Sequence, residues 1–154
     1  MGTYASETSV SADKSRAEIE HTLQRYGATA FMYGWDVGRA VLAFELKQRR
    51  YRILIPLPDR NDNAYLYTPG RRQRRSQSAA FQAWEQATRQ RWRAAALWIK
   101  AVLEAAESGI ISVEQALQPF TLLPSGQTIG EWMEPQIEQV YETGSMPPLL
   151  PGGR

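Results

Sequence analysis

Four arginines fall within five residues near the middle of the chain, and their side chains are well suited to binding anions. They are Arg71, Arg72, Arg74 and Arg75. A guanidinium group is always charged, and its planar fork of N–H donors can hold a phosphate through two parallel hydrogen bonds. No residue next to this run is acidic. We expect the run to bind phosphate groups; the alternative is a solvated loop whose charge only keeps it soluble.

Two further basic runs lie on either side of the first. Lys47–Arg52 spans a predicted hairpin turn, and Arg89–Arg93 lies in a predicted long helix. Residues 47–100 contain thirteen Lys and Arg against three Asp and Glu, a net charge of +10, whereas the whole chain carries +2. Such clusters attract polyanions and steer their approach. The charge distribution therefore indicates DNA or RNA as the partner, or alternatively a protein with an acidic site.

The three basic runs and Lys100 together contribute nine candidate nucleic-acid-binding residues. These are Arg50, Arg52, Arg71, Arg72, Arg74, Arg75, Arg89, Arg93 and Lys100. In the predicted strand, Arg50 and Arg52 share one face, which we expect to be solvated. In the predicted helix, Arg89 and Arg93 lie one turn apart and Lys100 two turns further on, which places three cations along one side.

Arg91 differs from the other basic residues of its run because it lies on the aromatic side of the predicted helix, near Trp84 and Trp98. Two interpretations stay open. Arg91 is either partly buried, stacked on an aromatic ring and paired with a carboxylate such as Glu131 or Glu138, or it reaches into a binding groove.

The sequence contains no comparable constellation for catalysis. It has no Cys and a single His, His21, which excludes a thiolate nucleophile and a Cys–zinc site and leaves a His-based triad without partners. Glutamates at helical spacing, such as Glu104 with Glu107, are equally typical of an exposed helix face. Phosphate-loop, dinucleotide-binding, nucleophile-elbow and zinc-protease motifs are absent. We expect a non-enzymatic protein without catalytic residues, metal site or cofactor.

The elements that must position these side chains indicate an α+β fold. It has an N-terminal helix, a three-stranded antiparallel meander, a long central helix and a C-terminal helical segment. Strands are predicted over residues 28–35, 39–46 and 51–55, and the long helix over 79–107. Capping boxes are predicted at Ser15, Ser112 and Thr128, and Pro135 is expected to kink or shorten the last helix.

Residues 1–144 are expected to form one domain that contains a basic, mobile loop over residues 59–77, with a Pro-rich extended tail over 145–154. The order of the helices and strands is also that of double-stranded-RNA-binding domains. However, the loop before the long helix is longer than in those domains, and a lysine-rich cluster at the helix start is missing. No apolar run approaches the ~20 residues that span a bilayer, and a signal peptide is not evident, so a cytoplasmic protein is expected.

Short segments along most of the chain form a distinctive combination. They are Tyr4-Ala5, Asp13–Glu20, Arg25–Ala28, Leu54–Pro58, Arg89–Ala94, Ile99–Glu104, Leu123-Pro124 with Gly126, and Tyr141–Pro151. In this combination the chain resembles uncharacterised proteins encoded by tailed phages and prophages. The resemblance brings no catalytic residue. It implies an accessory protein in the host cytoplasm that serves phage DNA metabolism, or alternatively a protein-interaction module whose basic surface inhibits a host defence complex.

Overall fold

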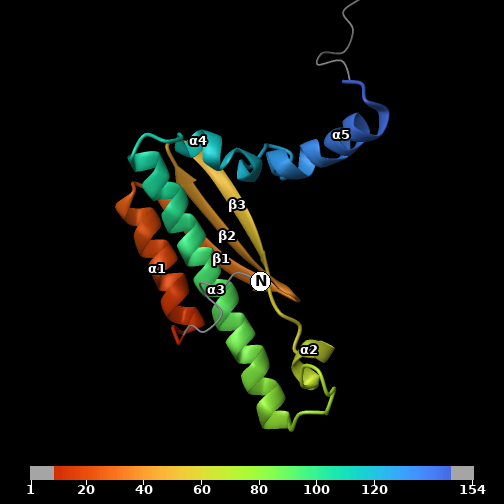
Figure 1. Ribbon diagram of the computed structural model, residues 1–154. Helices are drawn as coiled ribbons and strands as arrows, with labels where there is room; N and C mark the ends of the chain where they lie inside the picture. The colour runs from red at the N-terminus through yellow and green to blue at the C-terminus, as the bar shows by residue number, and fades with distance from the viewer. Residues whose placement is uncertain (1–8, 147–154) are drawn as a thin grey trace, which may run out of the picture.

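Three strands form one antiparallel sheet in the order β1–β2–β3 (Figure 1). β1 spans Ala30–Asp36, β2 spans Arg39–Leu46 and β3 spans Arg49–Pro56. The protein is described by a computed structural model that places residues 9–146. Lys47 and Gln48 join β2 to β3 with positive φ angles of 49° and 63°, as a two-residue hairpin requires for its twist to match the strands.

Two helices cover one face of this sheet and bury the core between themselves and the strands (Figure 1). α1 spans Ala12–Arg25 and α3 spans Gln77–Glu107. The strands alternate as expected, so that every second residue of β2 and β3 points into the core. The largest fully buried side chains are Trp92, Tyr51, Ile19, Leu23, Leu42, Leu46 and Leu103.

The first half of α3 extends beyond the sheet and carries a small lobe (Figure 1). Residues 59–76 form this lobe together with residues 77–91 of α3, and the short helix α2, Asn63–Leu66, packs on α3 there. Residues 59–77 were expected to form a basic, mobile loop. They contain α2 and a bridge between Tyr67 and Arg74, so this segment has more local structure than the sequence indicated.

The C-terminal segment attaches to the opposite end of the sheet. It comprises α4, Val113–Ala116, the 3₁₀ helix η1, Gln118–Phe120, and α5, Ile129–Thr143. Thr121 bridges to Tyr51 at the outer edge of β3, and the amide of Leu122 donates to the carbonyl of Arg50 over 2.8 Å. α5 then projects away from the body, and none of its residues is buried (Figure 1).

The predicted fold class is confirmed, and so are the capping boxes at Ser112 and Thr128. The capping box at Ser15 was wrong, because α1 begins one turn earlier with Ser11 as its cap and Ser15 is completely buried. Pro135 does not shorten the last helix, which continues through it to Thr143. Of the predicted Pro-rich tail, only Ser145 and Met146 are among the described residues.

Candidate nucleic-acid interface

A tight turn at the tip of the lobe presents the central arginine run. The amide of Thr68 donates to the carbonyl of Gln73 over 2.8 Å, and the amide of Gln73 donates back to Thr68 Oγ1 over 3.1 Å. Residues 68–74, here called the arginine turn, are therefore closed by hydrogen bonds at their base. This closure holds the intervening side chains on an ordered support.

Arg75 fastens the arginine turn to α2 and does not point to solvent as a phosphate ligand would. Its amide donates to the carbonyl of Leu66 over 2.8 Å, and its Nη1 donates to the carbonyls of Ala64 and Tyr65, each over 3.0 Å. The last carbonyls of a helix have no partner within the helix, so a guanidinium group there satisfies them. The structure thus gives Arg75 an anchoring role where the sequence had suggested a phosphate contact.

The three arginines within the turn itself have free guanidinium groups. Arg71, Arg72 and Arg74 are exposed, and among the described residues no hydrogen bond or ion pair engages their side chains. The two carboxylates of the same segment are used elsewhere. Asp59 accepts from the amide of Asn61, and Asp62 caps α2 by accepting from the amide of Ala64. The positive charge of the turn is therefore available to an external anion.

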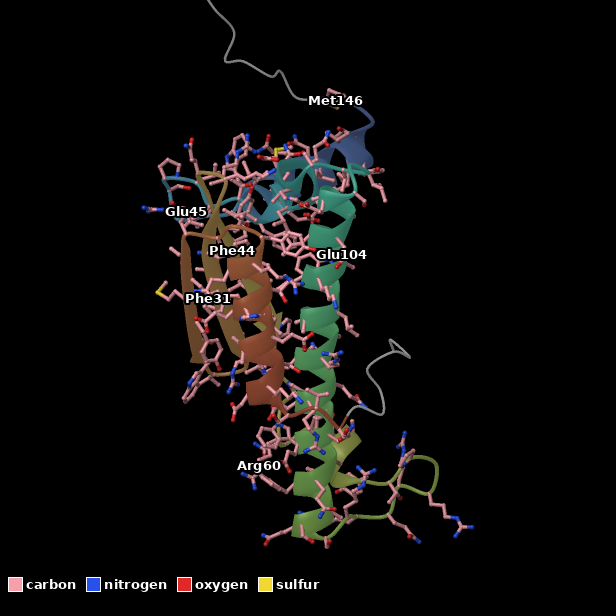
Figure 2. All side chains as sticks on the ribbon, turned by 90° about the vertical axis from the view of Figure 1, so that its left-hand side faces the viewer. Phe31, Phe44, Glu45, Arg60, Glu104 and Met146 are labelled. Carbon is pink, nitrogen blue, oxygen red and sulfur yellow. The ribbon has the colours of Figure 1, made fainter. Side chains whose placement is uncertain are left out.

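A further arginine of the lobe, Arg60, lies over two aromatic rings of α3. The guanidinium carbon of Arg60 lies 4.8 Å from the ring centre of Phe81 and 5.7 Å from that of Trp84. Trp84 is fixed because its Nε1 donates to the carbonyl of Pro58 over 2.9 Å. Figure 2 shows Arg60 beside the projecting half of α3. Sequence reasoning missed Arg60, because its neighbours Asp59 and Asp62 made this stretch look neutral.

A shallow hollow opens between α2 and the arginine turn. It is lined by Asn63, Ala64, Tyr67, Thr68, Pro69, Gly70 and Arg72. Tyr67, Ala64 and Pro69 therefore line the same hollow as Arg72, whose guanidinium group has no partner among the described residues. Tyr67 was not among the predicted residues. The signal that could have revealed it is the pair Tyr65 and Tyr67 a few residues before the arginine run.

Arg52 of β3 is not solvated, which corrects the sequence expectation. Its Nη1 donates to the carbonyl of Gly126 over 2.8 Å, and its Nη2 donates to Glu131 Oε2 over 2.6 Å. The C-terminal segment crosses this side of the strand and leaves the Arg52 side chain 25% exposed. The amide of Thr128 and the charge of Arg52 together lower the pKa of Glu131 below its ordinary value. Arg52 thus holds the start of α5 against the sheet.

The predicted cationic stripe on α3 is also largely engaged within the protein. Arg93 Nη1 donates to Glu18 Oε2 of α1 over 2.6 Å, which ties the two covering helices together. Arg89 binds Gln86 and lies 3.7 Å from Glu85, both on its own helix. Lys100 is exposed and has no partner among the described residues. The stripe therefore offers one free cation where three were expected.

Arg91 is bound to the end of the sheet. Its Nη1 donates to the carbonyl of Pro56 at the end of β3 over 2.9 Å. Of the two carboxylates proposed for it, Glu131 binds Arg52 instead, and Glu138 forms no ion pair with Arg91. Arg91 is exposed and stacks on no aromatic ring of the described residues, so the expected burial and stacking were wrong. Its bond to a backbone carbonyl is the one part of the structural interpretation that the geometry supports.

Arg50 is exposed but lies far from the arginine turn. Its side chain is 77% exposed and has only a loose ion pair with Glu45, over 3.4 Å. Glu45 lies at one end of the molecule in Figure 2 and Arg60 at the other. The nine predicted residues therefore do not form one surface. The structure groups Arg71, Arg72 and Arg74 on the lobe, leaves Arg50 and Lys100 exposed elsewhere, and engages the other four.

Within residues 9–146, no group of three or more His, Asp or Glu side chains could hold a metal ion. No helix in the same range is long and apolar enough to cross a membrane. In the comparisons with known proteins, no protein-family model, no curated protein and no solved structure matches this chain.

Proposed function

We propose that this protein is a non-enzymatic nucleic-acid-binding accessory protein of phage DNA metabolism, acting in the host cytoplasm. The observation that carries the proposal is the set of three free guanidinium groups on the hydrogen-bonded arginine turn. Because the backbone of the turn is already ordered, it loses little conformational entropy when the arginines bind phosphates. The phage assignment rests on the sequence resemblance alone.

Phosphate binding at the turn would be driven by the release of counterions from the nucleic acid. Each phosphate neutralised by an arginine releases condensed cations, so the affinity falls as salt rises. Arg71, Arg72 and Arg74 lie on one short turn, so we expect them to bind neighbouring phosphates of a single strand. Because phosphates carry no sequence information, this contact would be independent of base sequence.

The fold shares its order of elements with double-stranded-RNA-binding domains, yet the geometry does not favour their mode of contact. In that mode, cations near the start of the long helix touch phosphates across a groove. Here Arg89 and Arg93 on α3 bind Gln86 and Glu18, and Arg91 binds the carbonyl of Pro56. Because these helix arginines are already bound within the protein, the arginine turn is the better candidate for the contact with phosphates.

A salt titration with labelled oligonucleotides tests the proposal. Fluorescence anisotropy would be measured with single- and double-stranded DNA and RNA, starting at about 50 mM salt. The combined change Arg71→Ala, Arg72→Ala and Arg74→Ala should weaken binding on the order of 100-fold and flatten the salt dependence. Absence of binding by the unaltered protein at low salt would contradict the proposal.

A matched control removes the same charge from the other end of the molecule. Lys47→Ala, Arg49→Ala and Arg50→Ala take away three exposed cations at the β2–β3 hairpin. These substitutions should weaken binding only by the small change in overall charge. Equal losses from the two triple variants would show that binding follows net charge and not the arginine turn.

The alternative function is a protein-interaction module that inhibits a host defence complex. The observation that favours it is that the free arginines lie on a turn at the tip of a lobe, where the carboxylates of an acidic partner could reach them as readily as phosphates. A nuclease-treated pull-down with the unaltered protein and the arginine-turn variant separates the two functions. An acidic host protein retained only by the unaltered chain supports the alternative, and its absence supports nucleic acid.

A further inference from the structure

The hollow beside the arginine turn is lined by aromatic and apolar residues, which the binding of phosphates alone would not require. Its volume of about 840 Å³ lies within the range of about 300–1,000 Å³ typical of small-ligand clefts. Its lining residues include an aromatic one, Tyr67, together with the exposed cation Arg72. We propose that the hollow binds an unstacked nucleobase of a single-stranded nucleic acid against Tyr67, while the arginine turn binds the adjoining phosphates.

This inference rests on the proposed function and narrows its ligand to single strands. In a duplex the bases are paired and stacked, so their faces cannot enter a recess on a protein. Single strands expose the faces of their bases, and proteins bind them by combining aromatic platforms with cations that follow the backbone. The lobe offers both kinds of group within a few residues of each other.

Polar groups in the hollow could contact the edge of a base. Asn63 lines it and is exposed, and an amide side chain can donate and accept at once. Thr68 Oγ1 accepts from the amide of Gln73 and keeps its own hydroxyl hydrogen for donation. Because neither group fixes one pattern of donors and acceptors, the hollow should accept different bases.

The backbone of Arg72 adopts a turn conformation that is uncommon for arginine. Its φ angle is +49°, in the left-handed region that residues other than Gly and Asn rarely adopt. Gly70, two residues earlier, also has a positive φ, where glycine meets no penalty. Lys47 has the same φ in the β2–β3 hairpin, so this angle belongs to the tight turn, whose backbone fixes the point from which the Arg72 side chain extends.

The walls of the hollow are held in place before any ligand arrives. Arg75 binds the carbonyls of Ala64 and Tyr65, and the bridge between Tyr67 and Arg74 closes the base of the turn. A pre-formed site loses less conformational entropy on binding, so its contacts contribute more to affinity.

The decisive experiment compares two oligonucleotides of equal length and charge. One is a single strand of thymidines, and the other has the same backbone with abasic sites in place of the bases. Stacking of one base on an aromatic side chain strengthens binding roughly 5- to 150-fold. We expect the thymidine strand to bind more tightly than the abasic strand by a factor in this range. The matching uridine strand, made of RNA, should behave like the thymidine strand.

Tyr67→Leu should lower the affinity for the thymidine strand to that for the abasic strand and leave the salt dependence unchanged. Tyr65→Leu is the matched control, because Tyr65 lies two residues earlier and does not line the hollow. Equal binding of the two strands by the unaltered protein would overturn the inference while leaving the proposed function intact. Equal effects of the two tyrosine substitutions would also overturn it. Failure of the unaltered protein to bind either strand would instead contradict the proposed function.

Arg72→Asn separates binding from folding. Asparagine tolerates the left-handed conformation, so the melting temperature should equal or exceed that of the unaltered protein. The affinity for both strands should fall, and the salt dependence should become shallower by about 0.7 for the lost phosphate contact. Unchanged affinity with the same slope would remove Arg72 from the site and overturn the inference.

Discussion

The arginine turn and the body of the protein use the same residue type in opposite ways. In the body, Arg52 and Arg93 each lie 2.6 Å from a glutamate contributed by another element, and each side chain is 25% exposed. In the turn, Arg71, Arg72 and Arg74 are exposed, and no described residue pairs with their side chains. The first kind of arginine holds elements together, and the second is available to a ligand.

This difference follows from where the carboxylates are. Residues 101–146 contain seven glutamates and no Lys or Arg, and Glu131 of this stretch binds Arg52. The C-terminal segment lies at the end of the sheet opposite to the lobe (Figure 1). Glu131 of this segment therefore reaches Arg52 of the body, Glu18 of α1 reaches Arg93, and no described carboxylate pairs with an arginine of the turn. The net charge of a segment overestimates the number of arginines that can bind a ligand, because it includes arginines already paired with carboxylates of the protein.

The largest effect should separate binding from stability at the arginine turn. The triple alanine change at Arg71, Arg72 and Arg74 should weaken oligonucleotide binding on the order of 100-fold, yet alter the free energy of unfolding by less than about 0.5 kcal/mol, as is usual for exposed residues without partners. Anisotropy and urea unfolding measure the two quantities. A loss of stability by several kcal/mol would show that these arginines are structural after all.

Arg52→Ala should give the reverse pattern. The carbonyl of Gly126 and the carboxylate of Glu131 lose their partner, so the free energy of unfolding should fall by about 1–2 kcal/mol, with the oligonucleotide affinity within about twofold of the original. Arg50→Ala on the same strand is the control and should cost less than about 0.5 kcal/mol, because its ion pair is loose and exposed. Equal losses from the two substitutions would mean that Arg52 is not an anchor.

A smaller effect is expected at the pair that joins α1 to α3. A double-mutant cycle with Glu18→Gln and Arg93→Ala should give a coupling energy of about 0.5–1 kcal/mol, since both side chains are partly exposed and solvent weakens their attraction. Urea unfolding of the four proteins in the cycle provides the measurement. A coupling energy of zero would mean that the ion pair between Arg93 and Glu18 does not stabilise the fold.

The smallest effect concerns the pH dependence of stability. The pKa of Glu131 is lowered in the folded protein, so its ionised form stabilises the fold above its ordinary value of 4.5. That contribution is lost as the pH falls through the lowered pKa. Glu131→Gln should flatten the decline of the melting temperature in this acidic range and leave the rest of the profile unchanged. An identical acid profile in the variant would remove Glu131 as the cause.

The fold was largely predictable because its signals are local. The alternation of Leu42, Phe44 and Leu46 identifies a strand with one buried face, and the capping box at Thr128 identifies the start of α5. The start of α1 was missed because Ser11 and Ser15 both suit a helix cap. Only tertiary packing decides between them, by burying Ser15 in the core.

The candidate site was only partly predictable because the partners of an arginine are distant in sequence. Arg52 and Glu131 lie 79 residues apart, and Arg93 and Glu18 lie 75 apart, so no spacing rule links them. Arg71, Arg72 and Arg74 were identified because the density of the run is itself a local signal. The hollow at Tyr67 depends on how α2 packs beside the turn, which composition alone does not reveal.

Helix α5 has no buried residue and forms a second protruding end of the molecule, which a protease can attack independently of the lobe. It packs on the body mainly through its contact with η1, so its outer turns should open locally and expose their amides without global unfolding. Residues 101–146 offer trypsin no cleavage site, whereas a glutamate-specific protease finds Glu138 and Glu142 in α5. Trypsin in turn finds the arginine turn. Two proteases should therefore nick the protein at opposite ends, and a bound oligonucleotide should protect only the end that trypsin attacks.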